Sequence, residues 1–309
     1  MYFSLRNNLE NFTLWILCMD EDTYNLLNQM QLPNIKLIAL KDFETDDLKK
    51  VKKERTIAEY CWTCAAPLNL YLLEKEKVDM ITYLDADIYF YSDIKPVFDE
   101  IGDSSIAIIE HRFSQDRAYM EKTAGRFNVE WVSFKNDTYG FEAAKWWKDK
   151  VIEWCYNRFE DGKMGDQLYL NDWPERFKKV CIIKYKGAGL APWNLGNYKI
   201  NFKNNAIYID DKKLIFYHFH GMHQISKNLF RKALGYHISK KIKNLIYTPY
   251  FKQLQRNINF VLNYDKNFNY GFIHVPLKEI ILDKIMEYKS LSNFIVCLVK
   301  VKNKLLSKK

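Results

Sequence analysis

The stretch Ile81–Asp93 reads ITYLDADIYFYSD, and the rest of the chain is interpreted around it. Apolar and β-branched residues lead up to Asp85, and aromatic residues continue after Asp87, which is typical of a buried strand with a functional end. In an extended chain, residues two apart project to the same side. We therefore expect Asp85 and Asp87 to direct two carboxylates at one point beside an apolar core.

Two neighbouring carboxylates repel each other and lose hydration, so a cation must compensate for their charge. A divalent metal is the simplest such cation, and a metal with open coordination positions also binds a diphosphate. The segment His218-Phe219-His220-Gly221 follows a later predicted strand and offers an imidazole ligand. Two carboxylates and one imidazole favour Mn²⁺ over Mg²⁺. The alternatives are a solvated Asp-rich turn and a hydrogen-bonded core histidine.

Strand-like and helix-like segments alternate along the first two thirds of the chain. Strands are expected at Phe12–Met19, Ile35–Leu40, Ser105–Glu110, Phe127–Phe134 and Val180–Tyr185, and helices at Thr23–Gln31, Arg55–Glu74 (kinked or divided at Pro67), Val97–Ile101 and Phe141–Arg158. A hairpin of Ala206–Ile209 with Lys213–Tyr217 should deliver the histidines. The alternation predicts an α/β fold with a mostly parallel sheet flanked by helices, and a ligand beyond the C-terminal strand ends.

The positive charge of the chain is concentrated in its last part. The 309 residues carry a net charge of +9 and are 48% hydrophobic, which excludes global disorder. From Ile225 to Lys309 there are 17 basic and 4 acidic residues. We therefore expect a catalytic domain at 1–224 and a basic helical extension at 225–309. The extension either binds an anionic membrane surface or packs back on the domain. Nucleic acid is not expected, because no binding motif accompanies the charge.

The cysteines and the apolar segments indicate where the protein acts. Six scattered cysteines and no secretory signal at Met1 predict reduced thiols and a cytoplasmic protein. Cys61-Trp62-Thr63-Cys64 has a dithiol spacing, but it lies in a helical segment and is interpreted as packing. Leu291–Val301 is too short to span a membrane and is broken by Lys300. The protein is expected to be soluble or peripheral on the inner face of the cell membrane.

The segment around Asp85 resembles the Asp-any-Asp motif of nucleotide-sugar-dependent glycosyltransferases with the GT-A fold. Further segments follow the order found in glycosyltransferase family eight, the galactosyltransferase and glycogenin-like group. They are Arg126-Phe127-Asn128, Gly165-Asp166-Gln167 before Leu170-Asn171, Trp193-Asn194 and His218-Phe219-His220-Gly221. The resemblance covers roughly Phe12 to Gly221 and depends on the ordered set, because each segment alone is weak.

The resemblance implies a metal-dependent transferase. Asp85, Asp87 and His218 would bind Mn²⁺ (or Mg²⁺) against the diphosphate of a nucleotide sugar, in this case a UDP-sugar. Asp166 and Gln167 would face the sugar near its anomeric carbon. The implied donor-binding residues are Arg55, Asp85, Ala86, Asp87, Asn128, Asn194 and Gly221. The family also implies retention of the anomeric configuration. A glycan or lipid-linked acceptor, in surface polysaccharide or lipopolysaccharide synthesis, would receive the sugar.

The chain departs from the family pattern in three places. It starts in what resembles the helix after the first nucleotide-binding strand, so that this strand is apparently missing. Glu130 stands where the family has a glycine, and Gln224 stands where it has a lysine. Two other readings stay open. One is a haloacid-dehalogenase-like phosphatase with Asp85 as nucleophile, although Tyr89 replaces that fold's Thr or Val. The other is an inactive transferase fold that serves as a binding module.

Overall fold

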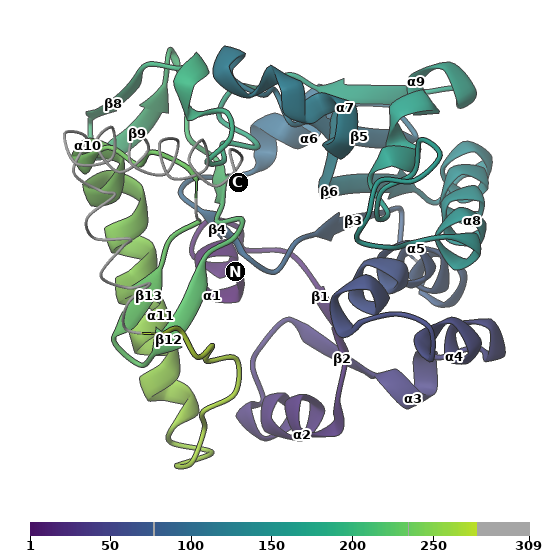
Figure 1. Cartoon of the computed structure of the whole chain (residues 1–309), viewed down its shortest axis with the longest axis horizontal. Coiled ribbons are helices and arrows are strands. Elements are labelled where there is room, and N and C mark those ends of the chain that lie inside the picture. The colour runs from purple at the N-terminus through teal and green to yellow at the C-terminus, as the bar shows by residue number, and fades with distance from the viewer. Residues whose placement is uncertain (77, 234, 277–309) are drawn as a thin grey trace, which may run out of the picture. The chain divides into compact units, whose positions relative to one another are not determined.

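The computed structural model describes residues 1–76, 78–233 and 235–276. Contacts within the chain divide it into two compact units, with the division after Phe219. The first unit contains sheets with helices packed against them, and the expected α/β class is confirmed (Figure 1). The expected domain boundary between residues 224 and 225 stays a prediction.

The first unit begins with a short helix and a β–α–β segment. Helix α1 (Tyr2–Arg6) is followed by strand β1 (Leu14–Cys18), helix α2 (Glu21–Met30) and strand β2 (Ile35–Ala39). β1 and β2 pair in parallel, as the crossover through a helix requires. The N-cap Asp20 accepts a hydrogen bond from a backbone N–H in the first turn of α2. Both expected strands and the helix between them are present.

The central sheet has four strands in the order β3-β6-β5-β7. These are β3 (Met80–Leu84), β6 (Phe127–Lys135), β5 (Ile106–Glu110) and β7 (Val180–Ile183). β5 and β7 are parallel, whereas β6 is antiparallel to β3 and to β5. The sheet is therefore mixed, with β3, β5 and β7 running in one direction. A strand buried on both faces is a continuous apolar run in either direction, so its residue pattern does not encode its orientation.

Two long helices pack against this sheet and against each other. α5 (Ile57–Lys75) begins with a capping box and continues through Pro67, so the helix is not divided there. α8 (Thr138–Glu153) places Trp147 in the core, where it contacts Trp173 edge-on. Trp147 is fully buried. Further helices are α3 (Leu40–Phe43), α4 (Asp46–Lys52), α6 (Lys95–Ile101), η1 (Gln115–Met120), α7 (Glu121–Ala124), η2 (Leu168–Asp172), α9 (Trp173–Arg176) and η3 (Leu195–Asn197).

The expected hairpin at residues 206–217 is only partly correct. β9 (Ala206–Ile209) pairs with β8 (Ile200–Lys203) on one side and with β10 (Lys212–Lys213) on the other. The chain then leaves this sheet, and β11 (Phe216–His218) pairs antiparallel with β4 (Ile88–Phe90). Phe216 is fully buried and its ring stacks on that of Trp131, at a centroid distance of 5.6 Å. Burial of these aromatic surfaces favours the pairing with β4 over a longer hairpin.

The second unit contains a hairpin and a helical segment. The hairpin joins β12 (His223–Ser226) and β13 (Leu229–Arg231). α10 (Lys240–Ile242), the π-helical turn η4 (Lys243–Tyr247) and α11 (Thr248–Val261) follow. The rings of Phe230 and Phe251 stack at a centroid distance of 4.8 Å and join the hairpin to α11.

Across the described part of the chain, every helix is too short or too polar to traverse a bilayer. The apolar segment Leu291–Val301 lies outside the described residues.

Candidate metal centre

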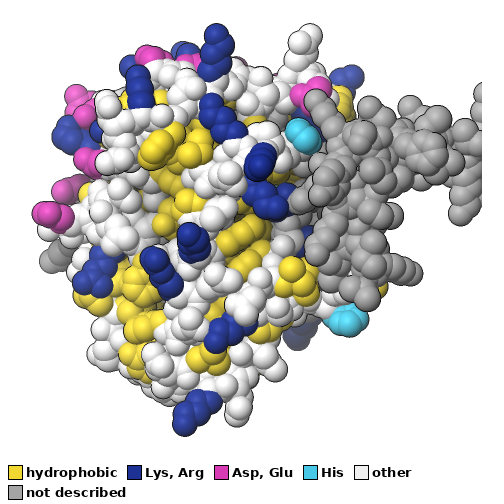
Figure 2. Space-filling view, turned by 90° about the vertical axis from the view of Figure 1, so that its left-hand side faces the viewer, with side chains coloured by type: hydrophobic (Ala, Val, Ile, Leu, Met, Phe, Trp, Pro, Cys, Tyr) yellow, Lys and Arg dark blue, Asp and Glu magenta, His cyan; other side chains and the backbone are white. Residues whose placement is uncertain are grey.

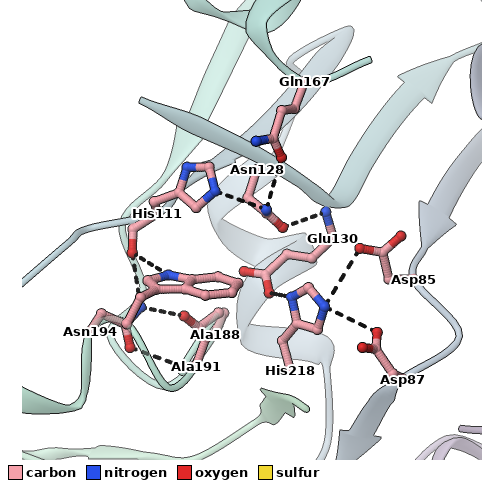
Figure 3. Close-up of polar contacts among 12 residues, drawn as sticks. Asp85, Asp87, His111, Asn128, Glu130, Gln167, Ala188, Ala191, Asn194 and His218 are labelled. Carbon is pink, nitrogen blue, oxygen red and sulfur yellow. Dashed lines mark hydrogen bonds and ion pairs between the residues drawn. The ribbon is translucent and has the colours of Figure 1, made fainter. Parts of the chain in front are cut away.

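Asp85 and Asp87 lie in the turn between β3 and β4. The sequence predicted one extended stretch, but β3 ends at Leu84 and β4 begins at Ile88. The backbone N–H of Ile88 donates to the carbonyl of Asp85 over 3.4 Å, which closes the turn. The turn replaces the expected extended geometry, yet both carboxylates still face the same side chain, that of His218 (Figure 3).

The pairing of β4 with β11 places His218 beside this turn. In its register, His218 is opposite Ile88, the residue directly after Asp87. The backbone N–H of Phe219 donates to the carbonyl of Asp87, and that of His218 donates to the carbonyl of Leu190. The histidine backbone is thus held from two sides. This explains how residues far apart in the sequence meet at one point.

The three side chains converge on one point. His218 Nε2 lies 3.0 Å from Asp87 Oδ1 and 3.7 Å from Asp85 Oδ2. One ligand atom from each residue lies within 4.8 Å of the other two. Two ligands about 2.1 Å from an octahedral ion and at a right angle are about 3 Å apart, so these separations suit one divalent cation. The convergence predicted from the sequence is confirmed.

The three side chains are buried to different extents, and the difference suits a metal ion with open coordination positions. The side chain of His218 is 4% exposed, whereas those of Asp85 and Asp87 are 30% and 42% exposed. The imidazole therefore closes the inner side of the site, and the carboxylates border solvent. A cation held there could bind a further ligand, such as a diphosphate, from the solvent side.

The electrostatics of the group also favour a cation. Burial raises the pKa of Asp85 to about 6, and the charges of Asp87 and Glu130 add to this rise while His218 opposes it. Burial by itself lowers the pKa of His218, but the charges of Asp87 and Glu130 outweigh burial and raise that pKa well above its usual value. Without a metal, the proton on His218 thus supplies the charge that the carboxylates require.

Glu130 is a member of this group that the sequence analysis did not assign. It lies in the middle of β6 with no exposed surface, and its Oε2 accepts a hydrogen bond from His218 Nδ1 over 2.7 Å. The sequence analysis noted it only as a departure from the family glycine. The available signal was a glutamate inside the mostly apolar run Phe127–Phe134, because fully buried glutamates are rare unless they are paired.

Asp166 lies near the same carboxylates. Burial raises the pKa of Asp166 to about 8, and the charge of Asp85 adds to the rise. Tyr83 interacts with both carboxyl groups. Its hydroxyl donates to Asp85 Oδ1 over 3.2 Å, and the charge of Asp166 contributes to raising the pKa of Tyr83. The Trp147 indole N–H donates to the backbone carbonyl of Asp166 and anchors the segment. The raised pKa of Asp166 therefore favours its protonated form as long as no cation lies beside Asp85.

Asn128 and Gln167 form a second polar group beside Glu130. The amide of Asn128 donates to Gln167 Oε1 over 3.4 Å and hydrogen-bonds His111 Nε2 at 3.0 Å. Gln167 Nε2 donates to the carbonyl of Ala124. His111 is buried and was not found in the sequence analysis, because nothing in its local sequence distinguishes it.

The amino-acid sequence of this chain is similar to those of two proteins of Bacillus subtilis. No family model matches it. "Uncharacterized protein YfnD" of Bacillus subtilis (strain 168) is 34% identical over 278 residues, which cover 88% of this chain and 89% of YfnD. The chain belongs to the YfnD family. "Uncharacterized protein YfnF" of the same organism is 31% identical over 280 residues, which cover 88% of this chain and 91% of YfnF.

Among solved structures, the glycosyltransferase GlyE of Streptococcus pneumoniae TIGR4 aligns with 62% of this YfnD-family chain at 18% identity, with a TM-score of 0.39. The alignment covers 43% of the GlyE chain, so this chain spans less than half of that structure.

Three other predicted donor-binding residues of this YfnD-family chain lie in the first unit. Ala86 is exposed in the turn between the two aspartates. Asn194 is fully buried, and its amide bonds the backbone of Ala191, His111 and Gly189, so it holds the loop after β7 together.

Arg55 is buried, and its guanidinium donates to Thr63 and to the carbonyl of Ile152. These contacts join α5 to α8, and the donor-binding role of Arg55 stays a prediction. Gly221 belongs to the second unit, where its φ of +68° favours glycine.

Proposed function

We propose that this protein is a metal-dependent glycosyltransferase that moves a sugar from a nucleotide-sugar donor, a UDP-sugar, to a glycan or lipid-linked acceptor. The observation that carries the proposal is the convergence of Asp85, Asp87 and His218. The same residues form the first and last motifs of the glycosyltransferase resemblance. Surface polysaccharide or lipopolysaccharide synthesis is the setting that this class of reaction suggests.

The charges near the centre suit the transfer of a sugar. Breaking the bond between sugar and diphosphate develops positive charge on the sugar and negative charge on the leaving group. When bound, a divalent cation stabilises the leaving diphosphate as a Lewis acid. Asp166 and Gln167 lie beside the group and offer oxygens that can face the sugar. Retention of configuration remains part of the proposal and depends on the family resemblance.

The donor set favours Mn²⁺. Asp85 and Asp87 supply carboxylate oxygens, which suit both Mg²⁺ and Mn²⁺. The imidazole of His218 is a softer ligand that favours the transition metal. We therefore expect Mn²⁺ to support donor binding better than Mg²⁺ does.

The second unit suggests that the protein binds its acceptor at a membrane surface. Figure 2 shows a face on which Lys and Arg side chains are spread among apolar ones, with acidic side chains near its edges. α11 is amphipathic: Tyr250 and Ile258 are buried, whereas Lys252 and Arg256 are exposed. Because the apolar face of α11 is buried in the protein, its exposed basic residues are what an anionic bilayer would attract electrostatically, so we propose peripheral binding to the inner face of the cell membrane.

Sedimentation with vesicles tests this membrane binding. The full chain should pellet with phosphatidylglycerol vesicles at low salt and not with phosphatidylcholine vesicles. The double variant Lys252→Glu, Arg256→Glu should pellet less. Equal binding to both lipids, or an unchanged double variant, would contradict this part of the proposal.

A donor screen tests the function. The purified full chain is titrated calorimetrically with UDP-, GDP- and CMP-sugars, with and without Mn²⁺. We expect binding of a UDP-sugar that requires Mn²⁺ and is lost in Asp87→Ala. Asp99→Ala is the matched control, because Asp99 is exposed and its carboxylate forms an ion pair only with Lys95 among the residues that the structure describes. Unchanged Mn²⁺-dependent binding by Asp87→Ala would refute the role of the centre.

Two other outcomes would favour the alternatives. A protein that binds neither Mn²⁺ nor any nucleotide sugar would be a binding module with a transferase fold. Hydrolysis of p-nitrophenyl phosphate that is lost in Asp85→Asn would indicate the phosphatase.

A further inference from the structure

Glu130 lies where the pairing of strand β6 with β5 is interrupted. The register between β5 and β6 shifts between Ile108 and Ile109, and Glu130 is the middle one of the residues of β6 that oppose no residue of β5. Bulges of this kind occur next to active sites, where they change the direction of a side chain. The N–H of Glu130 donates to Asn128 Oδ1 over 2.8 Å, and its carbonyl accepts from the N–H of Asp85 over 3.4 Å. The bulged backbone is thus fixed on both sides.

The carboxylate of Glu130 is inside the protein and has a single hydrogen bond among the described residues. Its Oε2 accepts from His218 Nδ1, whereas its Oε1 has no hydrogen-bond partner there. A buried carboxylate costs several kcal/mol unless it is paired. The pair with His218 is therefore the interaction that makes Glu130 tolerable at this position.

This hydrogen bond determines how the imidazole is oriented. With its Nδ1–H donated to Glu130, His218 turns Nε2 toward Asp85 and Asp87 (Figure 3). A carboxylate that accepts from the other ring nitrogen is the usual partner of a metal-binding histidine. It fixes the ring and makes the ligand nitrogen more basic.

We propose that Glu130 is the positioning residue of the metal centre. It holds His218 with Nε2 available to a divalent cation beside Asp85 and Asp87, and it strengthens the bond from that nitrogen. The proposal rests on the metal-dependent function proposed above. A merely structural Glu130 would affect stability and leave the coordination of the cation unchanged.

The test compares Glu130→Gln with the full-length wild type. Glutamine keeps the shape, removes the charge and can donate to Nδ1, so that it no longer enforces one ring orientation. Mn²⁺ affinity is measured from the electron paramagnetic resonance of free Mn²⁺, alone and with excess UDP. The nitrogen ligand is detected by ¹⁴N electron spin-echo modulation. Glu59→Gln is the matched control, because Glu59 is also buried and its carboxylate bonds the backbone of Asn157.

We expect about 10- to 100-fold weaker Mn²⁺ binding and a weakened ¹⁴N signal in Glu130→Gln. His218→Ala should lack the ¹⁴N signal, and Glu59→Gln should match the wild type. Wild-type affinity together with an unchanged ¹⁴N signal in Glu130→Gln would overturn the assignment of Glu130 alone. A wild type that binds no Mn²⁺, with or without UDP, would overturn the metal-dependent function and this inference with it.

A second measurement needs no variant of Glu130 and applies if Glu130→Gln does not fold. The wild type is labelled with ¹⁵N-histidine, and the tautomer of His218 is read from long-range proton–nitrogen spectra with saturating Mg²⁺. His218→Ala identifies the signal. A proton on Nδ1 together with a proton-free Nε2 supports the proposal. A proton-free Nδ1, or protons on both ring nitrogens at saturating Mg²⁺, would overturn it.

Discussion

Substituting alanine for Gly189 should test how tightly the loop after β7 packs on the metal centre. Gly189 has a φ of +70°, which costs an L-residue about 1–2 kcal/mol. A Cβ there would lie 2.6 Å from Ile109 Cδ1, 2.7 Å from Glu130 Oε1 and 2.8 Å from Arg112 Nη2. Ile109 and Glu130 are fully buried and have little room to move, so overpacking adds about 1–3 kcal/mol. We expect Gly189→Ala to lower the free energy of unfolding by about 2–5 kcal/mol.

Gly162 provides the matched control. Its φ is +72°, nearly the same as that of Gly189, but no heavy atom lies within 4 Å of the position of its Cβ. Gly162→Ala should therefore show only the backbone cost of about 1–2 kcal/mol. Urea denaturation followed by circular dichroism measures both variants. If Gly189→Ala loses no more stability than Gly162→Ala, Gly189 does not pack closely against Glu130.

Three further predictions concern the centre and its loop. Mn²⁺ at about 100 times its Kd should raise the free energy of unfolding by about 2.7 kcal/mol in the wild type and by far less in His218→Ala, as measured by denaturation with and without metal. Because the pKa of Asp166 is raised to about 8, the folded protein retains a proton that the unfolded chain releases above about pH 4. Stability should therefore fall as the pH rises from about 4 to 8, and denaturation of Asp166→Asn should show a smaller fall, mostly below about pH 6, where the raised pKa of Asp85 still contributes. Asn194→Ala removes three buried hydrogen bonds and should lower the free energy of unfolding by about 2–4 kcal/mol in urea denaturation. Asn197→Ala removes one hydrogen bond to the carbonyl of Arg112 and should lower it by less than about 1 kcal/mol. Equal losses in the two variants would contradict the role of Asn194.

Residue types and their spacing were sufficient to predict much of the centre. The pair Asp85 and Asp87 follows a buried run, and the charge argument alone required a cation beside it. His218 was separated from His220 by the family resemblance and not by physical chemistry, since both follow the same predicted strand. The structure places His218 in β11, where the pairing with β4 brings it to the aspartates.

Other features depended on contacts that a linear pattern does not contain. The donor-binding role of Asn194 stays a prediction; in the structure its amide bonds the backbone of Ala191 and Gly189 in its own loop and of His111 just after β5. A side-chain amide has the same chemistry whether it binds a donor or the backbone of its own protein. Only the folded position of the loop determines which partners it meets.

The sequence by itself determined the α/β class, the long helices α5 and α8, the β1–β2 crossover and the acidic end of β3, because these follow from local propensity and from the periodicity of apolar residues. The tertiary structure alone decided that β6 runs antiparallel between β3 and β5, that Asp85–Asp87 form a turn, and that Glu130 meets His218. Strand direction and bulge position depend on pairing between segments far apart in the chain, and the energy of that pairing is shared between both partners.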